Sequence, residues 1–493
     1  MHNPTPLFPA LRSSLAPMGA RIKSITRVLK QATLIQIEER FNLALKPNPL
    51  QRPFQGDHSR RRIFSLERTF WGWVWQVLQS NTSCREVVRQ VQTLFALHTQ
   101  KELDEGTSAY CQARAKVPLS MLEGALNASA SSVQKRARAS SSLQARPLKA
   151  IDGTGIRIHD TPGNRAQYPS SKNQFAKPSF PIMKVIALFC VASGAILAQA
   201  TGSLLSSELR LFMDVLSHLK PKDILLADRH YGCFVVAAWL QRWQVDLIAR
   251  LNTRSRKVNF RKAYKRLGSL DALFLWNKPG RASSLLTLKQ WKSLPQKLIV
   301  RILRVRVQQR GFRTKELTLV TTLLDPASYP AHEILQSYLK RWRIEMCFDD
   351  LKTTLGMEML SCKSPAMVQK EWIVFLITHN FIRWIMVEAA QASQVDLERI
   401  SFKGTLDAFR QWTVGLVQVR GRAKRSKLIA LWRKFLQILV ADLLPLRPNR
   451  SEPRAIKKQS KYPPLNKPRH KYVERWSRNK RRRVARAKNA SLN

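Results

Sequence analysis

Acidic residues are scarce in this chain of 493 residues. Asp and Glu number 32 against 85 Lys and Arg, which gives a formal net charge of +53 at pH 7. A surface with so few acids repels itself unless it binds a polyanion. Hydrophobic residues make up 44% of the sequence, enough for folded cores, so a purely disordered basic protein is excluded. The composition favours nucleic acid as the partner, with an anionic membrane surface as the alternative.

Long hydrophobic runs are also lacking. The longest, Val185–Ala200, is shorter than the roughly 20 residues that a membrane span needs, and Ser193-Gly194 interrupts it. We expect two buried strands joined by a turn at this run. The first 23 residues contain no continuous apolar segment of signal-peptide length. These absences argue against a membrane protein.

Paired cysteines are the third absence. The six cysteines are scattered without a C-x-x-C motif, so neither a zinc knuckle nor a disulfide framework is indicated. We therefore expect a reduced, cytoplasmic protein. The cysteines are Cys84, Cys111, Cys190, Cys233, Cys347 and Cys362.

Basic residues are concentrated at the end of the chain without being confined to it. From Arg447 onward there are 17 Lys and Arg and two acids, a net charge of +15, which leaves 53 − 15 = +38 on residues 1–446. Five prolines exclude a long helix over most of this tail, which we expect to be disordered and to bind phosphates. The folded body must also face nucleic acid.

Changes in composition divide the chain into seven segments. Residues 128–145 are rich in Ser, Ala and Arg and are interpreted as a linker or exposed loop. The expected segments are a basic DNA-binding arm (1–62), a helical region and linker (63–145), the first part of an α/β core (146–251), a β-rich insertion (252–324), the second part of the core (325–390), a helical C-terminal region (391–446) and the basic tail (447–493).

The core segment predicts a regular order of elements. Apolar strands are expected at 148–151, 182–191, 195–201, 223–227 and 245–250, with amphipathic helices at 206–219 and 233–243. Three strands, a helix, a strand, a helix and a strand are typical of a ribonuclease-H-like α/β core. In residues 252–324, β-rich segments replace this order.

Two aspartates follow apolar strands of this core. Asp152 comes after Leu148–Ile151 and precedes small, turn-forming residues, and Asp228 comes after Asp223–Ala227. Strand ends place side chains at the rim of an α/β sheet, where ligands bind. Two carboxylates there repel each other unless a cation bridges them, and Mg²⁺ prefers oxygen ligands of this kind. A turn or helix-capping role is the alternative for either residue alone.

A third carboxylate lies on a predicted helix at 338–355. Tyr338, Arg341, Glu345 and Lys352 fall within an arc of about 60° at the helical period of about 100° per residue. One helix face thus offers a carboxylate for metal beside an aromatic ring and two cations for phosphate. Asp349, one turn after Glu345, competes for the role of ligand, and a solvated amphipathic face is the structural alternative.

At these residues the chain resembles the DDE transposases of bacterial insertion sequences, in the group called insertion sequence four. The group is marked by D-G-T, by D-R-x-[YF] and by Y-(2)-R-(3)-E-(6)-K. The chain has Asp152-Gly153-Thr154, Asp228-Arg229-His230-Tyr231 and the Tyr338, Arg341, Glu345, Lys352 series at the required spacing. The gap of 345 − 228 = 117 residues between the second and third acids fits a β-rich insertion. The resemblance runs from about residue 60 to 390.

The resemblance implies a site and its partners. Asp152, Asp228 and Glu345 would hold two Mg²⁺ ions, for which Mn²⁺ can substitute, and double-stranded DNA at transposon ends and targets would be the substrate. Tyr338, Arg341, Lys352 and Arg229 would bind DNA. Flipping of a base needs a stacking ring, for which the insertion supplies Trp276 and Trp291. A homodimer is expected because transposition joins two ends, with apolar helices 372–390 and 428–444 as candidate interfaces.

Two other functions stay open from the sequence. A non-catalytic DNA-binding protein derived from such a transposase would bind DNA without metal and would not cleave it. A tyrosine recombinase with Tyr338 as nucleophile would work without metal and would leave the strand-end carboxylates without a role. The complete set of signature residues favours the transposase.

Overall fold

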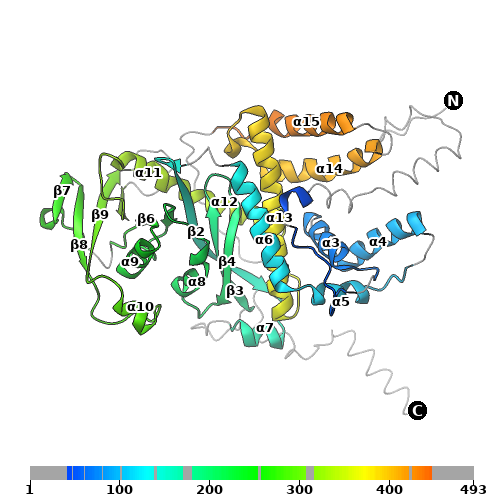
Figure 1. Ribbon diagram of the computed structural model, residues 1–493, viewed down its shortest axis with the longest axis horizontal. Helices are drawn as coiled ribbons and strands as arrows, with labels where there is room; N and C mark the ends of the chain where they lie inside the picture. The colour runs from blue at the N-terminus through cyan, green and yellow to red at the C-terminus, as the bar shows by residue number, and fades with distance from the viewer. Residues whose placement is uncertain are drawn as a thin grey trace, which may run out of the picture.

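A computed structural model of the protein describes residues 41–446 except 47, 60–61, 80–81, 100–102, 138–141, 170–179, 254–256, 307–315 and 421–424. The expected basic arm and basic tail therefore lie largely or wholly outside the described residues. The described part is a mixed α/β structure with a large sheet and many helices (Figure 1).

One sheet of 11 strands organises the fold, in the order β4-β3-β2-β5-β6-β10-β9-β8-β7, with β1 and β11 also paired to β2. Strands β2, β5 and β6 are parallel, whereas β3, β4 and β10 join the sheet antiparallel to their neighbours. The strands are β1 (Ser142–Leu143), β2 (Arg146–Ile158), β3 (Ile182–Cys190), β4 (Ile196–Ser203), β5 (Ile224–Ala227), β6 (Asp246–Arg250), β7 (Lys265–Gly268), β8 (Asp271–Asn277), β9 (Lys297–Arg306), β10 (Glu316–Thr321) and β11 (Met359–Leu360).

Helices surround this sheet and form a separate group beyond it. In Figure 1, α13 and α6 stand between the sheet and α3, α4 and α5, and α6 contacts both β4 and α13. The helices are α3 (Leu66–Leu78), α4 (Cys84–Thr99), α5 (Ser108–Lys116), α6 (Leu119–Arg136), α7 (Pro162–Gln167), α8 (Glu208–Val215), α9 (Phe234–Arg242), α10 (Leu288–Lys292), α11 (Ala331–Leu339), α12 (Arg343–Asp349), α13 (Pro365–Ser393), α14 (Phe402–Arg420) and α15 (Arg425–Ala441).

The expected order of core elements is present as β2, β3, β4, α8, β5, α9 and β6. The Val185–Ala200 run forms β3 and β4 joined by a turn, as expected. A capping box begins α4, because the Ser83 amide donates to the Glu86 carboxylate and the Glu86 amide donates to Ser83 Oγ.

Two sequence expectations are wrong. Asp152 does not end a strand, since β2 continues to Ile158 and pairs with β3 from Lys149 to Arg157. Much of the expected linker at 128–145 is helical, because α6 extends to Arg136. Its small residues Ala128, Ser129 and Ala130 are buried, which lets α6 pack closely on α13.

Helix α13 is the central helix of the described part. By length and composition it could cross a membrane, but 89% of its apolar window is buried inside the protein. Asn380 on this helix accepts a hydrogen bond from the Ile196 amide and donates to the Ile196 carbonyl. These bonds satisfy the backbone at the start of β4 and join α13 to the sheet.

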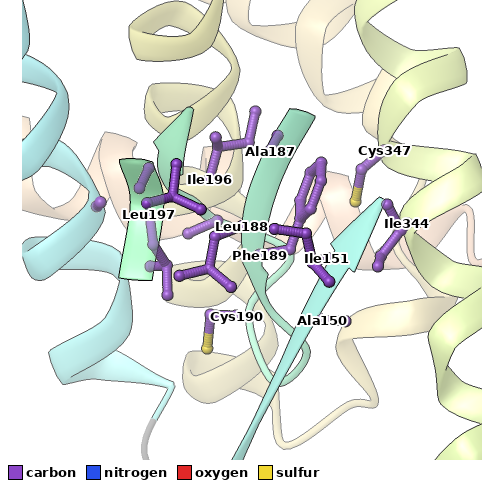
Figure 2. Close-up of a cluster of buried hydrophobic side chains, with 14 of the residues drawn as sticks. Ala150, Ile151, Ala187, Leu188, Phe189, Cys190, Ile196, Leu197, Ile344 and Cys347 are labelled. Atoms are coloured by element: carbon purple, nitrogen blue, oxygen red, sulfur yellow. The ribbon is translucent and has the colours of Figure 1, made fainter. Parts of the chain in front are cut away.

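A hydrophobic cluster lies between the sheet and α12. Figure 2 labels Ile344 and Cys347 of α12 and Phe189 of β3, and the Phe189 ring packs edge-on against Phe348 of α12 at 5.3 Å between ring centroids. Phe189, Ile344 and Cys347 are at most 5% exposed. Phe189 pairs with Ala150 of β2, two residues before Asp152, and Ile344 directly precedes Glu345, so burial of this cluster fixes the strand and helix that carry these two acids.

The region at 252–324 contains the expected strands, β7 to β10. Strand β10 pairs with β6 and β9 with β10, so the region extends the core sheet instead of forming a separate one. At the left of Figure 1, β7, β8 and β9 form the end of this extension.

Candidate functional site

Asp152 and Asp228 occupy equivalent places on the parallel neighbours β2 and β5. The last residue pair between β2 and β5 is Ala150 with Leu226. Asp152 and Asp228 each lie two residues beyond this pair, on β2 and directly after β5. Asp152 therefore lies level with the end of β5, although β2 itself continues to Ile158. Asp228 directly follows β5, and its Oδ1 accepts a hydrogen bond from the His230 amide at 2.7 Å.

The segment that carries Glu345 is helical but not one regular α-helix. Tyr338 lies on α11, Arg341 on the 3₁₀ turn Lys340–Trp342, Glu345 on α12 and Lys352 on the π-helical turn Asp350–Thr354. The expectation of one uniform helix is therefore corrected. Such turns are frequent at functional sites.

Arg341 joins two of the three acids. Its guanidinium donates to Asp152 Oδ2 at 3.0 Å and to Glu345 Oε1 at 3.4 Å. The Arg341 side chain is 8% exposed, that of Asp152 is 22% exposed and that of Glu345 is 53% exposed. The structure thus brings the strand acid and the helix acid to one cation.

The neighbouring signature residues lie around this pair. Lys352 Nζ donates to Thr154 Oγ1, two residues after Asp152 on the same strand face. Tyr338 is 3% exposed, and burial raises its pKa, partly offset by Arg341. Arg229 is exposed.

The acids are electrostatically coupled. Burial raises the pKa of Asp152, Arg341 opposes that rise, and Asp228 adds to it. Burial likewise raises the pKa of Glu345, again with Arg341 opposing and Asp152 adding. A further cation at this place would therefore be stabilised.

The donor set suits a hard divalent cation, since it consists of carboxylate oxygens. Within the described residues, however, no three His, Cys, Asp or Glu side chains are close enough to share one ion as they stand.

Asp349 is arranged differently from Glu345. It is exposed, and its Oδ1 accepts a hydrogen bond from Thr353 Oγ1 at 2.7 Å on its own helical segment. Glu345 is the acid that shares Arg341 with Asp152.

The two tryptophans considered for base stacking are buried. Trp276 on β8 is 9% exposed and Trp291 on α10 is 8% exposed, and Lys278 Nζ lies 5.1 Å from the Trp291 ring centroid. A ring that stacks on a base must offer a face, and neither ring offers an open one in this conformation.

Two residues near the site did not emerge from the sequence. Trp342 is 39% exposed, and the Arg341 guanidinium lies 4.8 Å from its ring centroid. In the sequence, its position next to Arg341 is the feature that points to it. Glu208 begins α8, and its pKa is raised by burial and by both Asp228 and Asp152. A lone Glu at the start of an amphipathic helix gave no signal of its own.

Comparison with known proteins relates the chain to transposases. Residues 144–381 match the family described as transposase DDE domain. The chain is 25% identical over 326 residues, 64% of its length, to 69% of the transposase InsG for insertion sequence element IS4 of Escherichia coli strain K12. The resemblance to the insertion-sequence-four group is thereby confirmed.

Among solved structures, the chain is similar to a piggyBac transposase in a synaptic complex with hairpin DNA. The TM-score is 0.39 at 10% identity, with 89% of this chain and 86% of that chain covered.

Proposed function

Since residues 144–381 match the family described as transposase DDE domain, we propose that the chain cleaves DNA at the inverted terminal repeats of its own insertion sequence and transfers the ends into target DNA. The observation that carries the proposal is the bridge of Arg341 between Asp152 and Glu345, with Asp228 at the matching place on the neighbouring strand.

The roles of the acids follow from their chemistry. Asp152, Asp228 and Glu345 would hold divalent metal ions, Mg²⁺ or Mn²⁺. When bound, such ions supply Lewis-acid stabilisation of the developing charge on phosphate and activation of the attacking hydroxyl. The carboxylates carry the negative charge that retains the ions, and burial between the sheet and α12 fixes the backbone that carries Asp152 and Glu345.

The cationic and aromatic residues would bind the DNA end. Arg341 and Lys352 can donate to phosphate oxygens, and the Tyr338 side chain is hydrogen-bonded with that of Arg341. Arg229 is exposed beside Asp228 and can contact the phosphate backbone of DNA. Trp342 has the better-exposed ring for stacking on a displaced base, whereas Trp276 or Trp291 would first have to become exposed.

The proposal extends to the organisation of the chain. Residues 146–251 and 325–390 would form a ribonuclease-H-like core, with 252–324 as a β-rich insertion between its parts. Residues 1–62 and 447–493 would bind DNA, 63–145 would be a helical module, and 391–446 would contribute to a homodimer that joins two ends. The protein would act in the cytoplasm on DNA.

A cleavage assay tests this function. The substrate is a plasmid that carries the gene with its native flanking DNA, with Mg²⁺ or with a chelator. We expect Mg²⁺-dependent cuts at the element ends, reduced to background in Asp152→Asn, Asp228→Asn and Glu345→Gln while end binding persists. Asp349→Asn is the matched control and should cut normally.

Three other outcomes are informative. Normal cutting by Glu345→Gln together with failure of Asp349→Asn would reassign the third ligand. Binding without any cuts would mean a non-catalytic descendant. A covalent link to Tyr338 formed without metal would mean a tyrosine recombinase.

A further inference from the structure

Glu208 lies on the opposite side of β2 from the Asp152 side chain. A Cβ atom added to Gly153 would lie 3.2 Å from Glu208 Cδ and 3.3 Å from Glu208 Oε1. Successive side chains of a strand point to opposite faces, so Glu208 occupies the face toward which a residue 153 side chain would point. Arg341 meets Asp152 on the other face. Glu208 and Glu345 therefore flank Asp152 from opposite faces of the sheet.

The Glu208 carboxylate is held in place by a buried tyrosine. Tyr231 Oη donates to Glu208 Oε1 at 3.0 Å. Tyr231 is fully buried and packs edge-on against Phe212 of α8 at 5.2 Å between ring centroids. Within the described part of the chain, Oε2 receives no hydrogen bond, so one oxygen is anchored while the other can bind a ligand.

Close packing around Gly153 leaves little room for a side chain at this position. The conformation of Gly153 is ordinary extended strand, which any residue adopts. A methyl group there would press on the Glu208 carboxylate, and also on Ile186 Cγ2 at 3.3 Å. Glycine in a strand interior often marks a close approach, and at Gly153 the approaching group is a carboxylate directed at the strand that carries Asp152.

We propose that Glu208 is a fourth carboxylate of the metal site, reaching it from the face opposite Glu345, and that Tyr231 and Gly153 are its positioning residues. The inference rests on the proposed function, because it concerns the same site. The burial of Glu208, which raises its pKa, and the further rise caused by Asp228 and Asp152 support the assignment. An acid at a helix N-terminus can also stabilise the helix, and the test must separate these two roles.

Metal affinity separates them. Mn²⁺ is titrated into the full chain and free Mn²⁺ is followed by electron paramagnetic resonance. We expect Glu208→Gln to weaken Mn²⁺ binding roughly 10- to 100-fold, the range typical of residues that support a metal site, while the chain stays folded. Cleavage by this variant should recover at high Mg²⁺. Asp214→Asn removes the same charge from an exposed position of the same helix and should bind as the wild type does.

A double-variant comparison tests the role of Gly153. Gly153→Ala should also weaken Mn²⁺ binding, and in a Glu208→Gln background it should add no further loss. Tyr231→Phe should give a smaller loss than Glu208→Gln. An additive loss in the double variant would overturn the positioning role of Gly153.

The failures are distinguishable. Wild-type Mn²⁺ affinity in Glu208→Gln, together with loss of binding in Glu345→Gln, would overturn the inference and leave the proposed function intact. A wild-type chain that neither binds Mn²⁺ nor cleaves DNA would overturn both.

Discussion

Arg341 binds two of the carboxylates, Asp152 and Glu345, that would also bind a metal ion. Without metal it is the cation that neutralises Asp152 and Glu345, and its removal leaves the largely buried Asp152 carboxylate unpaired. Breaking one side of a buried ion pair costs about 3–5 kcal/mol; the exposure of Glu345 favours the lower end of that range.

We therefore expect Arg341→Ala to lower stability without metal and Mg²⁺ to recover part of the loss, as followed by thermal unfolding with and without Mg²⁺. Arg165→Ala is the matched control, because Arg165 pairs with the buried Asp160 and its loss should not respond to Mg²⁺. An equal Mg²⁺ response in both variants would argue against ion binding beside Arg341.

Asp350 is a second residue whose charge is costly. Burial raises its pKa to about 7, with Arg383 opposing and Asp349 adding to the rise. It borders a cavity of about 740 Å³ that Lys340, Arg343 and Arg383 also line. A raised folded-state pKa means that the folded chain binds the proton more tightly than the unfolded chain. The contribution of Asp350 to folding stability is therefore fully present below about pH 4, where both states are protonated, and it is lost as the pH rises through about 7.

Asp350→Asn should therefore stabilise the protein at pH 8 by up to about 4 kcal/mol and have little effect at pH 4. Urea unfolding of the variant and the wild type between these pH values measures the difference. Asp214→Asn, which changes an exposed carboxylate, should show no such trend. A gain that does not depend on pH would point to altered packing instead.

At the scale of elements, the sequence predicted what apolar patterning controls. The predicted strands at 182–191 and 223–227 agree with β3 and β5 to within one residue, because each buries a continuous apolar stretch. The Asp152 strand was ended too early. Gly153-Thr154-Gly155 has the composition of a turn, and only pairing with β3 keeps it extended.

The segment at 338–355 shows a similar limit. Spacing at the helical period correctly put Arg341 and Glu345 on one face, but it could not predict the 3₁₀ and π turns that interrupt the helix. Contacts with β2 accompany them, since Arg341 reaches Asp152 and Lys352 reaches Thr154. The same limit hid Glu208, whose relation to Asp152 is created by the packing of α8 and cannot be read from their separation in the chain.

At the scale of the whole molecule, charge governs DNA affinity. The net charge of +53 includes +38 on residues 1–446, so neutralisation of phosphates is distributed along the chain. Each phosphate contact contributes about 0.9 to the slope of log affinity against log salt concentration. We expect a steep slope for the full chain, as measured by fluorescence anisotropy on a duplex of fixed length between low and moderate salt.

The terminal basic run provides a graded test of that distribution. Replacing Lys480, Arg481, Arg482 and Arg483 by Gln removes four charges and should lower the slope by at most about 4. Cleavage at saturating protein should be unchanged, because the acids of the site are untouched. The residual slope should still be steep, since most of the charge lies elsewhere. A flat salt response of the full chain would contradict phosphate neutralisation as the source of affinity, and a response lost entirely in the variant would confine DNA binding to the tail.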